Sequence, residues 1–271
     1  MQIFTNIMER AFPVFDPLGK RVLVVLSAFG AWCGFVWETI LWIVRPPFRF
    51  EQYLRQMEFV GVKSTWIIVL TSFFTGAVFA LQTGRVYALF NMETMVGATV
   101  AMSLTREIAP VFAAIMVTAR ACSAMAAEIG TMRVTEQIDA LEAMAVNPLQ
   151  YLVAPRIVAC TIMVPMLTML YNFVGVLGSY LVGIYLMSID EGPFMARLYH
   201  HVDPDDLWGG LIKAAVFGFL IAAISCFTGF HTEGGAKGVG RATTRAVVAS
   251  AVTILTTDYF LTTWILEYIS N

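Results

Sequence analysis

Long apolar segments separated by short polar ones dominate the sequence. Five of them are long enough for a transmembrane helix, which needs about 20 mainly apolar residues. They cover about residues 60–82, 93–127, 155–187, 207–230 and 246–269. Because backbone polar groups in hydrocarbon must be bonded within their own segment, this pattern predicts five transmembrane α-helices.

An earlier apolar segment, residues 22–44, has flanks that argue against a full crossing. Lys20 and Arg21 precede it and Arg45 follows it. Basic residues favour the cytoplasmic side, so both flanks favour the same side of the membrane. Glu38 inside the segment would cost about 2.5 kcal/mol or more at the centre of the bilayer. We therefore expect an interfacial or re-entrant elbow, with a full span as the alternative.

Ionisable residues in the second and fifth spans are candidate functional residues. Arg106 and Glu107 lie in the second span, and Pro110 removes a ladder hydrogen bond after them and is expected to kink the helix. Charged groups in a span are costly and usually face the protein interior or a wet cavity. The pair therefore either fixes helix packing or belongs to a functional site for a charged headgroup. Asp258 in the fifth span is either a buried packing acid or a partner for Arg106.

The stretch Glu128–Met144 is the long polar, amphipathic segment of the chain. Its apolar residues recur at helical spacing and form a single stripe: Val134, Ile138, Leu141 and Ala145. Asn147-Pro148 is expected to end this helix, because proline disfavours helical geometry in the residue before it. A short polar helix between two spans lies at one face of the membrane. It is either a solvated connector or a docking element for a soluble partner.

Basic residues set the expected orientation. They gather before the first span, up to Lys63, and between the fourth and fifth spans at Lys237, Arg241 and Arg245. The positive-inside rule places these segments and the polar stretch in the cytoplasm. The acidic loop 188–206 then lies outside. We expect a cytoplasmic N-terminus and, after five spans, a C-terminus on the opposite side of the membrane.

Composition supports a membrane location. The 271 residues are 58% hydrophobic and 13% charged, whereas soluble domains carry roughly 25% charged residues. The net charge of -2 gives no indication of nucleic-acid binding. We predict no metal site, because the four cysteines lie far apart in apolar segments and His200-His201 is a weak candidate pair.

Sequence motifs of catalysis are missing. The glycine-rich segment Gly234–Gly238 has the wrong spacing for a phosphate-binding loop. Neither an H-E-x-x-H zinc motif nor a G-x-S-x-G nucleophile elbow occurs. We therefore predict no catalytic residues and no nucleotide site in this chain. A transporter driven by a separate ATPase remains open, and its docking surface would be the polar stretch.

Five motifs occur together in the chain: Leu104–Pro110, Ala119–Ala124, Ala127–Leu141, Met144–Leu149 and Arg241–Val247. They resemble the MlaE/YrbE family, the permease subunits of phospholipid ABC transporters linked to mammalian-cell-entry (MCE) proteins. The resemblance covers about residues 55–265, in order. It indicates a five-helix MlaE-type permease domain, residues 56–271. The N-terminal interfacial or elbow region, residues 1–55, matches the family poorly and rests on the flanking charges together with analogy.

The resemblance implies an all-α polytopic permease of the bacterial inner membrane. Such a permease moves phospholipids between the inner membrane and the periplasm or outer membrane and maintains outer-membrane lipid asymmetry. It forms a homodimer with an outward-opening lipid cavity between the subunits. The implied partners are a cytoplasmic ABC ATPase dimer, which holds the ATP and magnesium, a periplasmic hexamer of MCE domains, and a small STAS-domain subunit. No cofactor is expected in this chain itself.

Candidate site residues follow from the same resemblance. The lipid cavity would include Gln82, Phe90, Arg106 and Glu107, and Phe90 occupies a position where relatives can have tyrosine. The surface that couples to the ATPase would include Glu128, Gly130, Met132, Arg133, Glu136, Gln137, Asp139 and Leu141. Two alternatives stay open. One is an ion-coupled secondary transporter that uses Arg106, Glu107 and Asp258, and the other is a membrane anchor that recruits a soluble complex without transport.

Overall fold

The computed structural model describes residues 23, 26–46 and 49–269, and every regular element there is a helix. Six helices among these residues are long and apolar enough to cross a membrane: Leu26–Val44, Phe50–Ala88, Glu93–Val134, Leu149–Leu186, Pro204–Phe230 and Gly235–Ile265. The five predicted spans fall on the last five of them. The predicted all-α polytopic membrane protein is therefore confirmed.

The chain divides into two compact units, Met1–Arg45 and Pro46–Asn271. In the first unit, the helix Leu26–Val44 is unbroken, so the break that a re-entrant segment needs is not found between these residues. Its length suits a full span, and the interfacial position stays a prediction. The part of the predicted elbow in residues 1–22 lies outside the described residues. The boundary between the units follows Arg45, whereas the sequence placed it after residue 55.

The second unit contains the remaining elements. It begins with α2 (Phe50–Val60), η1 (Val62–Ser64) and α3 (Thr65–Ala88). The second span is built from η2 (Glu93–Met95), α4 (Val96–Ser103), η3 (Leu104–Ile108), α5 (Ala109–Val117), η4 (Thr118–Cys122) and α6 (Ser123–Val134). After it come α7 (Gln137–Ala143), η5 (Leu149–Val153), α8 (Ala154–Leu181), η6 (Val182–Leu186), α9 (Glu191–His201), α10 (Pro204–Phe230) and α11 (Gly235–Ile269). The elements η3 to η6 are single turns of π-helix.

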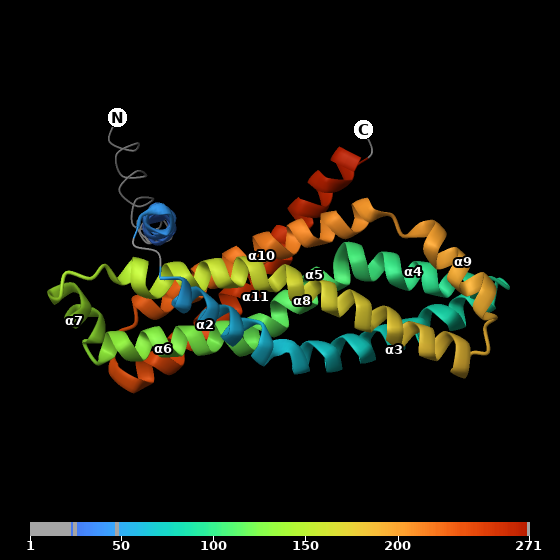
Figure 1. Cartoon of the computed structure of the whole chain (residues 1–271), viewed down its shortest axis with the longest axis horizontal. Helices are drawn as coiled ribbons and strands as arrows, with labels where there is room; N and C mark the ends of the chain where they lie inside the picture. Colours follow the sequence, from blue (N-terminus) through green and yellow to red (C-terminus); the bar gives the residue numbers. More distant parts are fainter. Residues whose placement is uncertain (1–22, 24–25, 47–48, 270–271) are drawn as a thin grey trace, which may run out of the picture. The chain divides into compact units, whose positions relative to one another are not determined.

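The spans of this second unit run side by side, with α7 at one end of the bundle and α9 at the other (Figure 1). Helix α8 packs against α2, α3 and α10. A Cβ added at Gly76 of α3 would collide with the backbone carbonyl of Gly175 on α8. Small residues allow such close backbone packing, which helps to hold helices together in a membrane because lipid tails are as apolar as leucine.

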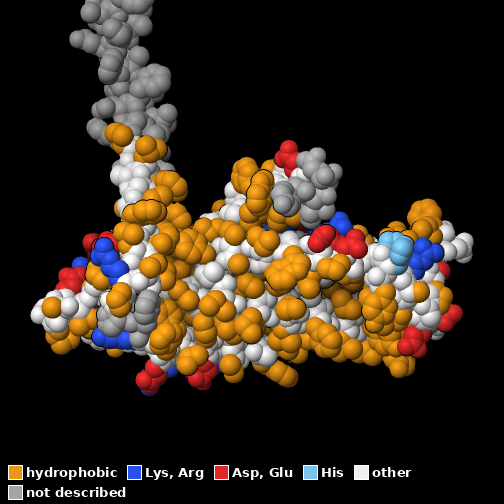
Figure 2. All heavy atoms as spheres, turned by 45° about the horizontal axis from the view of Figure 1, so that its top comes forward, with side chains coloured by type: hydrophobic (Ala, Val, Ile, Leu, Met, Phe, Trp, Pro, Cys, Tyr) orange, Lys and Arg blue, Asp and Glu red, His pale blue; other side chains and the backbone are white. Residues whose placement is uncertain are grey.

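Apolar side chains cover much of the outside of the bundle. Figure 2 shows them across the middle of one face, with charged side chains mainly toward its two ends and in one smaller group between them. The exposed large apolar residues include Trp66, Phe74, Met166, Phe173 and Val252. A soluble monomer rarely exposes so much contiguous apolar surface, so this surface fits a bundle surrounded by lipid.

The polar stretch is not one helix, which corrects the prediction for Glu128–Met144. Helix α6 continues the second span to Val134, and α7 is a separate helix of 7 residues. Between them Glu136 has a left-handed backbone, with a φ of 59°, and this conformation interrupts a right-handed helix. An ion pair between Arg133 and Asp139 (2.6 Å) joins the two pieces.

Asn147-Pro148 starts a helix rather than ending one. Helix α7 already ends at Ala143. The Asn147 Oδ1 atom accepts hydrogen bonds from the backbone N–H groups of Leu149 (2.9 Å) and Gln150 (3.3 Å), as a capping residue does at a helix N-terminus. Proline suits the first helical position, because its missing N–H would have no partner in the helix there.

The acidic segment 188–206 contains the helix α9, where the sequence predicted a loop. Phe194 anchors this helix with a fully buried ring. A Cβ added at Gly97 of α4 would lie 2.5 Å from that ring, and one added at Gly183 of η6 would lie 3.0 Å from it. The two glycines therefore leave a slot for the ring and fasten α9 to the bundle. Phe194 is the one residue of this helix that is buried, and one buried position carries too little periodicity to predict a helix.

Candidate functional site: a charge cluster inside the bundle

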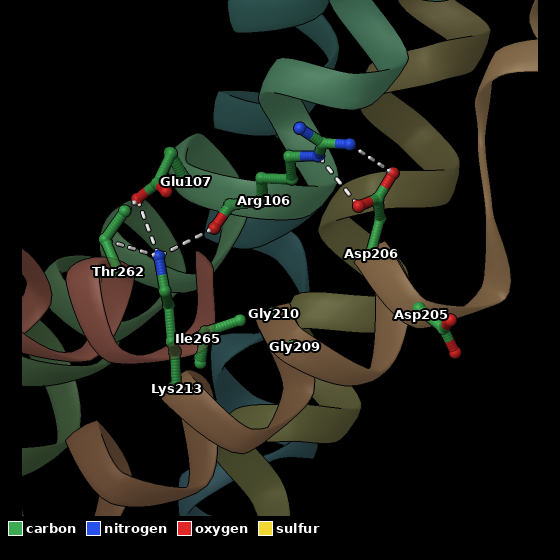
Figure 3. A pocket seen from close by; sticks show the side chains of 9 residues that line it. All are labelled: Arg106, Glu107, Asp205, Asp206, Gly209, Gly210, Lys213, Thr262 and Ile265. Carbon is green, nitrogen blue, oxygen red and sulfur yellow. Dashed lines mark hydrogen bonds and ion pairs between the residues drawn. The ribbon is translucent and has the colours of Figure 1, made fainter. Parts of the chain in front are cut away.

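Arg106 and Glu107 on η3 meet charged residues from two later spans. Asp206 and Lys213 come from α10, and Asp258 comes from α11. We call these five residues the charge cluster, and Figure 3 labels all of them except Asp258. Two basic and three acidic side chains thus join the second, fourth and fifth spans.

The backbone at η3 explains how Lys213 is held. Pro110 has no N–H group, so it cannot bond the carbonyl of Arg106 four residues earlier. Lys213 Nζ donates a hydrogen bond to that carbonyl instead (3.1 Å). Helix α10 reaches this point because Gly210 has no Cβ, which would collide with the carbonyl oxygen of Thr105. A π-turn therefore comes directly before Pro110, and π-turns are frequent at functional sites. The kink at Pro110 stays a prediction.

Arg106 pairs with Asp206 through two parallel hydrogen bonds. Nε donates to Oδ1 (2.8 Å) and Nη2 donates to Oδ2 (3.1 Å). This two-point pairing is the strong and geometrically specific mode between a guanidinium and a carboxylate. Asp206 is buried, so the pair fixes α10 against η3. The alternative that Asp258 is the partner of Arg106 is wrong, because Asp206 takes that place.

Lys213 is the centre of the other half of the cluster, and its side chain is only 3% exposed. Its Nζ donates to Glu107 Oε2 (2.8 Å), to Thr262 Oγ1 (2.7 Å) and to the carbonyl of Arg106. An ammonium group has three donors, so all of them are used. Asp258 Oδ1 lies 3.5 Å from Nζ and makes no hydrogen bond within the described part of the chain. Electrostatic attraction therefore links Asp258 to Lys213.

A cavity of about 60 Å³ lies beside the charge cluster. Figure 3 draws its lining, which is Arg106, Glu107, Asp205, Asp206, Gly209, Gly210, Lys213, Thr262 and Ile265. This volume holds a few water molecules, whereas pockets for small molecules have volumes of roughly 300–1,000 Å³. A single chain therefore does not enclose a lipid at this site.

The structure places the four predicted cavity residues in two groups. Arg106 and Glu107 line the cavity, and Gln82 and Phe90 do not. The side chain of Gln82 is exposed near the end of α3, and Phe90 is exposed in the turn that follows. The assignment of all four residues to one lipid cavity stays a prediction.

The predicted coupling residues also form two groups. Glu128 pairs with Arg156 on α8 (2.9 Å), whose side chain is 3% exposed, and a Cβ on Gly130 would lie 3.0 Å from Thr232 Oγ1. These two residues therefore fasten α6 to its own bundle. The other six are exposed or half-buried near the end of the bundle: Met132, Arg133, Glu136, Gln137, Asp139 and Leu141. Their role in coupling stays a prediction.

Sequence reasoning missed Asp206, Lys213 and Arg156 as partners. Lys213 lies in an apolar stretch two helical turns after Asp206, so the two share one face of α10. An ionisable residue inside a span signals pairing or function, and this signal applies to Lys213. Arg156 carries the same signal at the start of the third span.

The fold and the charge cluster together define a multi-pass helical membrane protein with paired charges inside its bundle. The model of the family "Permease MlaE" matches residues 53–264. The chain therefore belongs to the MlaE permease family.

Three relatives show how far the similarity extends. A probable ABC transporter permease protein of Rickettsia felis is 42% identical over 247 residues, which cover 91% of this chain and 95% of the relative. The intermembrane phospholipid transport system permease protein MlaE of Haemophilus influenzae is 39% identical over 248 residues, 90% of this chain and 94% of the relative. The chloroplastic protein TRIGALACTOSYLDIACYLGLYCEROL 1 of Arabidopsis thaliana is 36% identical over 230 residues, 85% of this chain and 66% of the relative.

Membership of this family places the chain among the permeases of ABC transporters. A permease of this kind is a non-catalytic membrane component, and its presence implies an ATPase partner. The predicted family and the predicted membrane-embedded architecture are both confirmed.

Proposed function

We propose that this chain is the permease subunit of an ABC transporter that moves phospholipids between the bacterial inner membrane and the periplasm or outer membrane, and so maintains outer-membrane lipid asymmetry. The observation that carries the proposal is the similarity, over 90% of the chain, to the Haemophilus influenzae permease named for intermembrane phospholipid transport. The chain would lie in the inner membrane with the α7 end in the cytoplasm and the C-terminus in the periplasm.

Two copies of the chain would form the lipid site between them. The cavity beside the charge cluster is too small for a lipid, so a lipid needs further space. The C-terminal half of α11 supports a second copy there, because its large apolar residues Tyr259, Phe260 and Trp264 are exposed in the single chain. In such a homodimer, Arg106 and Glu107 would act on the phosphate headgroup.

Energy from ATP would reach the lipid site mechanically, because the sequence has no phosphate-binding loop. Glu136 and Gln137 at the α6–α7 turn are exposed and give a surface for a cytoplasmic ATPase dimer that holds the ATP and magnesium. The Arg133–Asp139 pair ties α7 to α6, and the Glu128–Arg156 pair ties α6 to α8. A force on α7 would thus reach two spans. A periplasmic MCE-domain hexamer and a small STAS-domain subunit would complete the complex.

Reconstitution of the purified chain with its ATPase tests this function. We expect ATP-dependent movement of labelled phospholipid from the vesicles that contain the complex to an acceptor. Lipid movement driven by a proton or sodium gradient without any ATPase would instead establish an ion-coupled transporter. ATPase binding without lipid movement, in the wild type and in Glu107→Gln alike, would establish a membrane anchor.

The coupling surface has its own test. We expect the double variant Glu136→Ala/Gln137→Ala to weaken binding of the ATPase about tenfold, which corresponds to about 1.4 kcal/mol of interface free energy. The lipid-stimulated ATPase rate should fall with it when the ATPase is below saturation. Glu93→Ala on η2, next to α9 at the other end of the bundle, is the matched control and should keep the wild-type rate. An unchanged rate in the double variant, or an equal loss in the control, would contradict this surface.

A further inference from the structure

A second cavity lies where α10 ends and α11 begins, next to the end of α6. Its volume is about 340 Å³, within the range of pockets that bind small molecules. The lining residues are Phe227, Thr228, His231, Thr232, Glu233, Gly238, Arg241, Ala242 and Arg245. Thr232 in this lining contacts Gly130 of α6, so the cavity lies at the end of the bundle where α7 is found (Figure 1).

Two arginines give this cavity its charge. Arg241 and Arg245 are four residues apart on α11, so they lie on one face of the helix. The side chain of neither arginine makes an ion pair or a hydrogen bond with the residues that the structure describes. Glu233 is the carboxylate of the lining, and His231 Nδ1 donates a hydrogen bond to the Phe227 carbonyl (2.9 Å). Two guanidinium groups against one carboxylate give the lining a net positive charge that suits an anion.

The surface beside the arginines is apolar. Val248, Val252 and Leu255 follow Arg245 along α11 at intervals of three or four residues and are all exposed, so they continue the same helix face. Basic residues at a membrane boundary attract anionic lipids in general. Here, however, two guanidinium groups line a cavity of headgroup dimensions that borders an uncovered apolar strip.

We propose that this cavity binds the phosphate headgroup of an anionic phospholipid from the leaflet at the α7 end, with the acyl chains along Val248, Val252 and Leu255. An acidic segment of a protein partner would pair with the arginines but would leave the apolar strip uncovered, so a lipid fits both parts. The inference rests on the membrane location and goes beyond the proposed transport function, because a lipid held here is separate from the charge cluster.

The test uses the purified full chain in nanodiscs of phosphatidylcholine with a minor fraction of phosphatidylglycerol. Native mass spectrometry measures the phosphatidylglycerol retained when the protein is released. We expect Arg241→Gln and Arg245→Gln each to lower the apparent affinity about fivefold, the loss that corresponds to removal of one basic group at a membrane surface. Arg241→Lys, which keeps the charge, should retain part of the affinity.

Lys237→Gln is the matched control, because Lys237 lies one turn before Arg241, is exposed and does not line the cavity. This variant should retain phosphatidylglycerol as the wild type does. An equal loss in Lys237→Gln would reduce the effect to diffuse surface charge and overturn the proposal. Displacement of the lipid by millimolar inorganic phosphate would assign the site to free phosphate and would also overturn it.

A partner protein gives a third outcome. If Arg241→Gln weakens co-purification of the ATPase and leaves phosphatidylglycerol retention unchanged, the cavity takes an acidic side chain of that partner and the lipid proposal fails. Lipid movement in the reconstituted transporter is measured in parallel. Loss of lipid retention with transport still present would support this site and leave the transport function standing, so the two proposals fail separately.

Discussion

Lys213 neutralises carboxylates inside the bundle, where its own side chain is only 3% exposed. Its three donors are used by Glu107, Thr262 and the carbonyl of Arg106, and Asp258 lies 3.5 Å away. Charged groups survive in a span when they are paired inside the bundle. The position of this ammonium therefore determines which carboxylates the bundle tolerates.

Replacement of this cation measures its contribution. We expect Lys213→Met to lower the free energy of unfolding by about 2 kcal/mol, less than the roughly 3–5 kcal/mol lost when fully buried pairs are broken, because Glu107 is half-exposed. The measurement is the thermal unfolding transition in detergent. Addition of Glu107→Gln to Lys213→Met should recover part of the loss. Lys237→Met, at an exposed position, is the control, and an equal shift there would contradict the role of Lys213.

Glu128 gives a second prediction at this scale. The sequence assigned it to ATPase coupling, whereas the structure pairs it with the buried Arg156. We expect Glu128→Ala to lower the unfolding temperature of the isolated chain with no ATPase present, because an unpaired buried guanidinium is costly. The exposed Glu142 on α7 provides the control variant Glu142→Ala. Full stability of Glu128→Ala alone, with lost ATPase stimulation in the complex, would return Glu128 to the docking surface.

Single functional residues could be predicted only where the sequence itself shows that their burial is energetically costly. Arg106 and Glu107 stand out because an apolar segment surrounds them. Their partners Asp206 and Lys213 are 100 and 106 residues away, and nothing local encodes a pairing at that separation. The sequence alone therefore identified the two residues on η3, whereas their partners on α10 could be identified only from the structure.

At the scale of elements, the close packing of α3 against α8 depends on glycines, which have no side chain. Gly76 and Gly175 let the two backbones meet where a Cβ at Gly76 has no room. Lipid tails are as apolar as the helix surfaces, so the hydrophobic effect does not favour contact between helices over contact with lipid. Close packing of this kind therefore contributes much of the stability of helix association.

A methyl group at this contact tests the packing. We expect Gly76→Ala to force α3 away from α8 and to lower the free energy of unfolding by about 1–3 kcal/mol, as overpacking does in cores. Gly240→Ala on α11 is the matched control, since a Cβ there meets no atom within 4 Å and alanine favours a helix over glycine. Gly240→Ala should leave the thermal unfolding temperature equal or higher. A Gly76→Ala protein as stable as this control would show that the contact contributes little.

Hydrophobic periodicity predicted the spans well and their polar connections poorly. The five apolar segments became helices because length and hydropathy alone select a span. The polar stretch broke at Glu136, whose left-handed backbone is rare for a residue other than glycine and has no sequence signal of its own. Helix α9 was missed because the burial of Phe194 depends on glycines in two other elements.

In the second unit as a whole, the two ends of the bundle carry different structural features. One end carries α7, the exposed polar turn and the cavity with Arg241 and Arg245. The other carries α9, held by Phe194 (Figure 1). The charge cluster joins three spans between them. The two ends therefore present different surfaces, an exposed polar turn at one end and a helix anchored by a buried ring at the other.

The second span itself connects these ends, because Glu93–Val134 is one uninterrupted run of 42 helical residues. Such a run behaves as a rod, and the π-turn at η3 with Pro110 is the place where the rod bends most readily. If an ATPase binds at the α7 end, as proposed above, its movement would reach α9 through the second span, because α4 packs against α9. Lys213 and Asp206 hold the second span at this π-turn through their ion pairs with Glu107 and Arg106. Any such movement would therefore strain these pairs before it reaches α9.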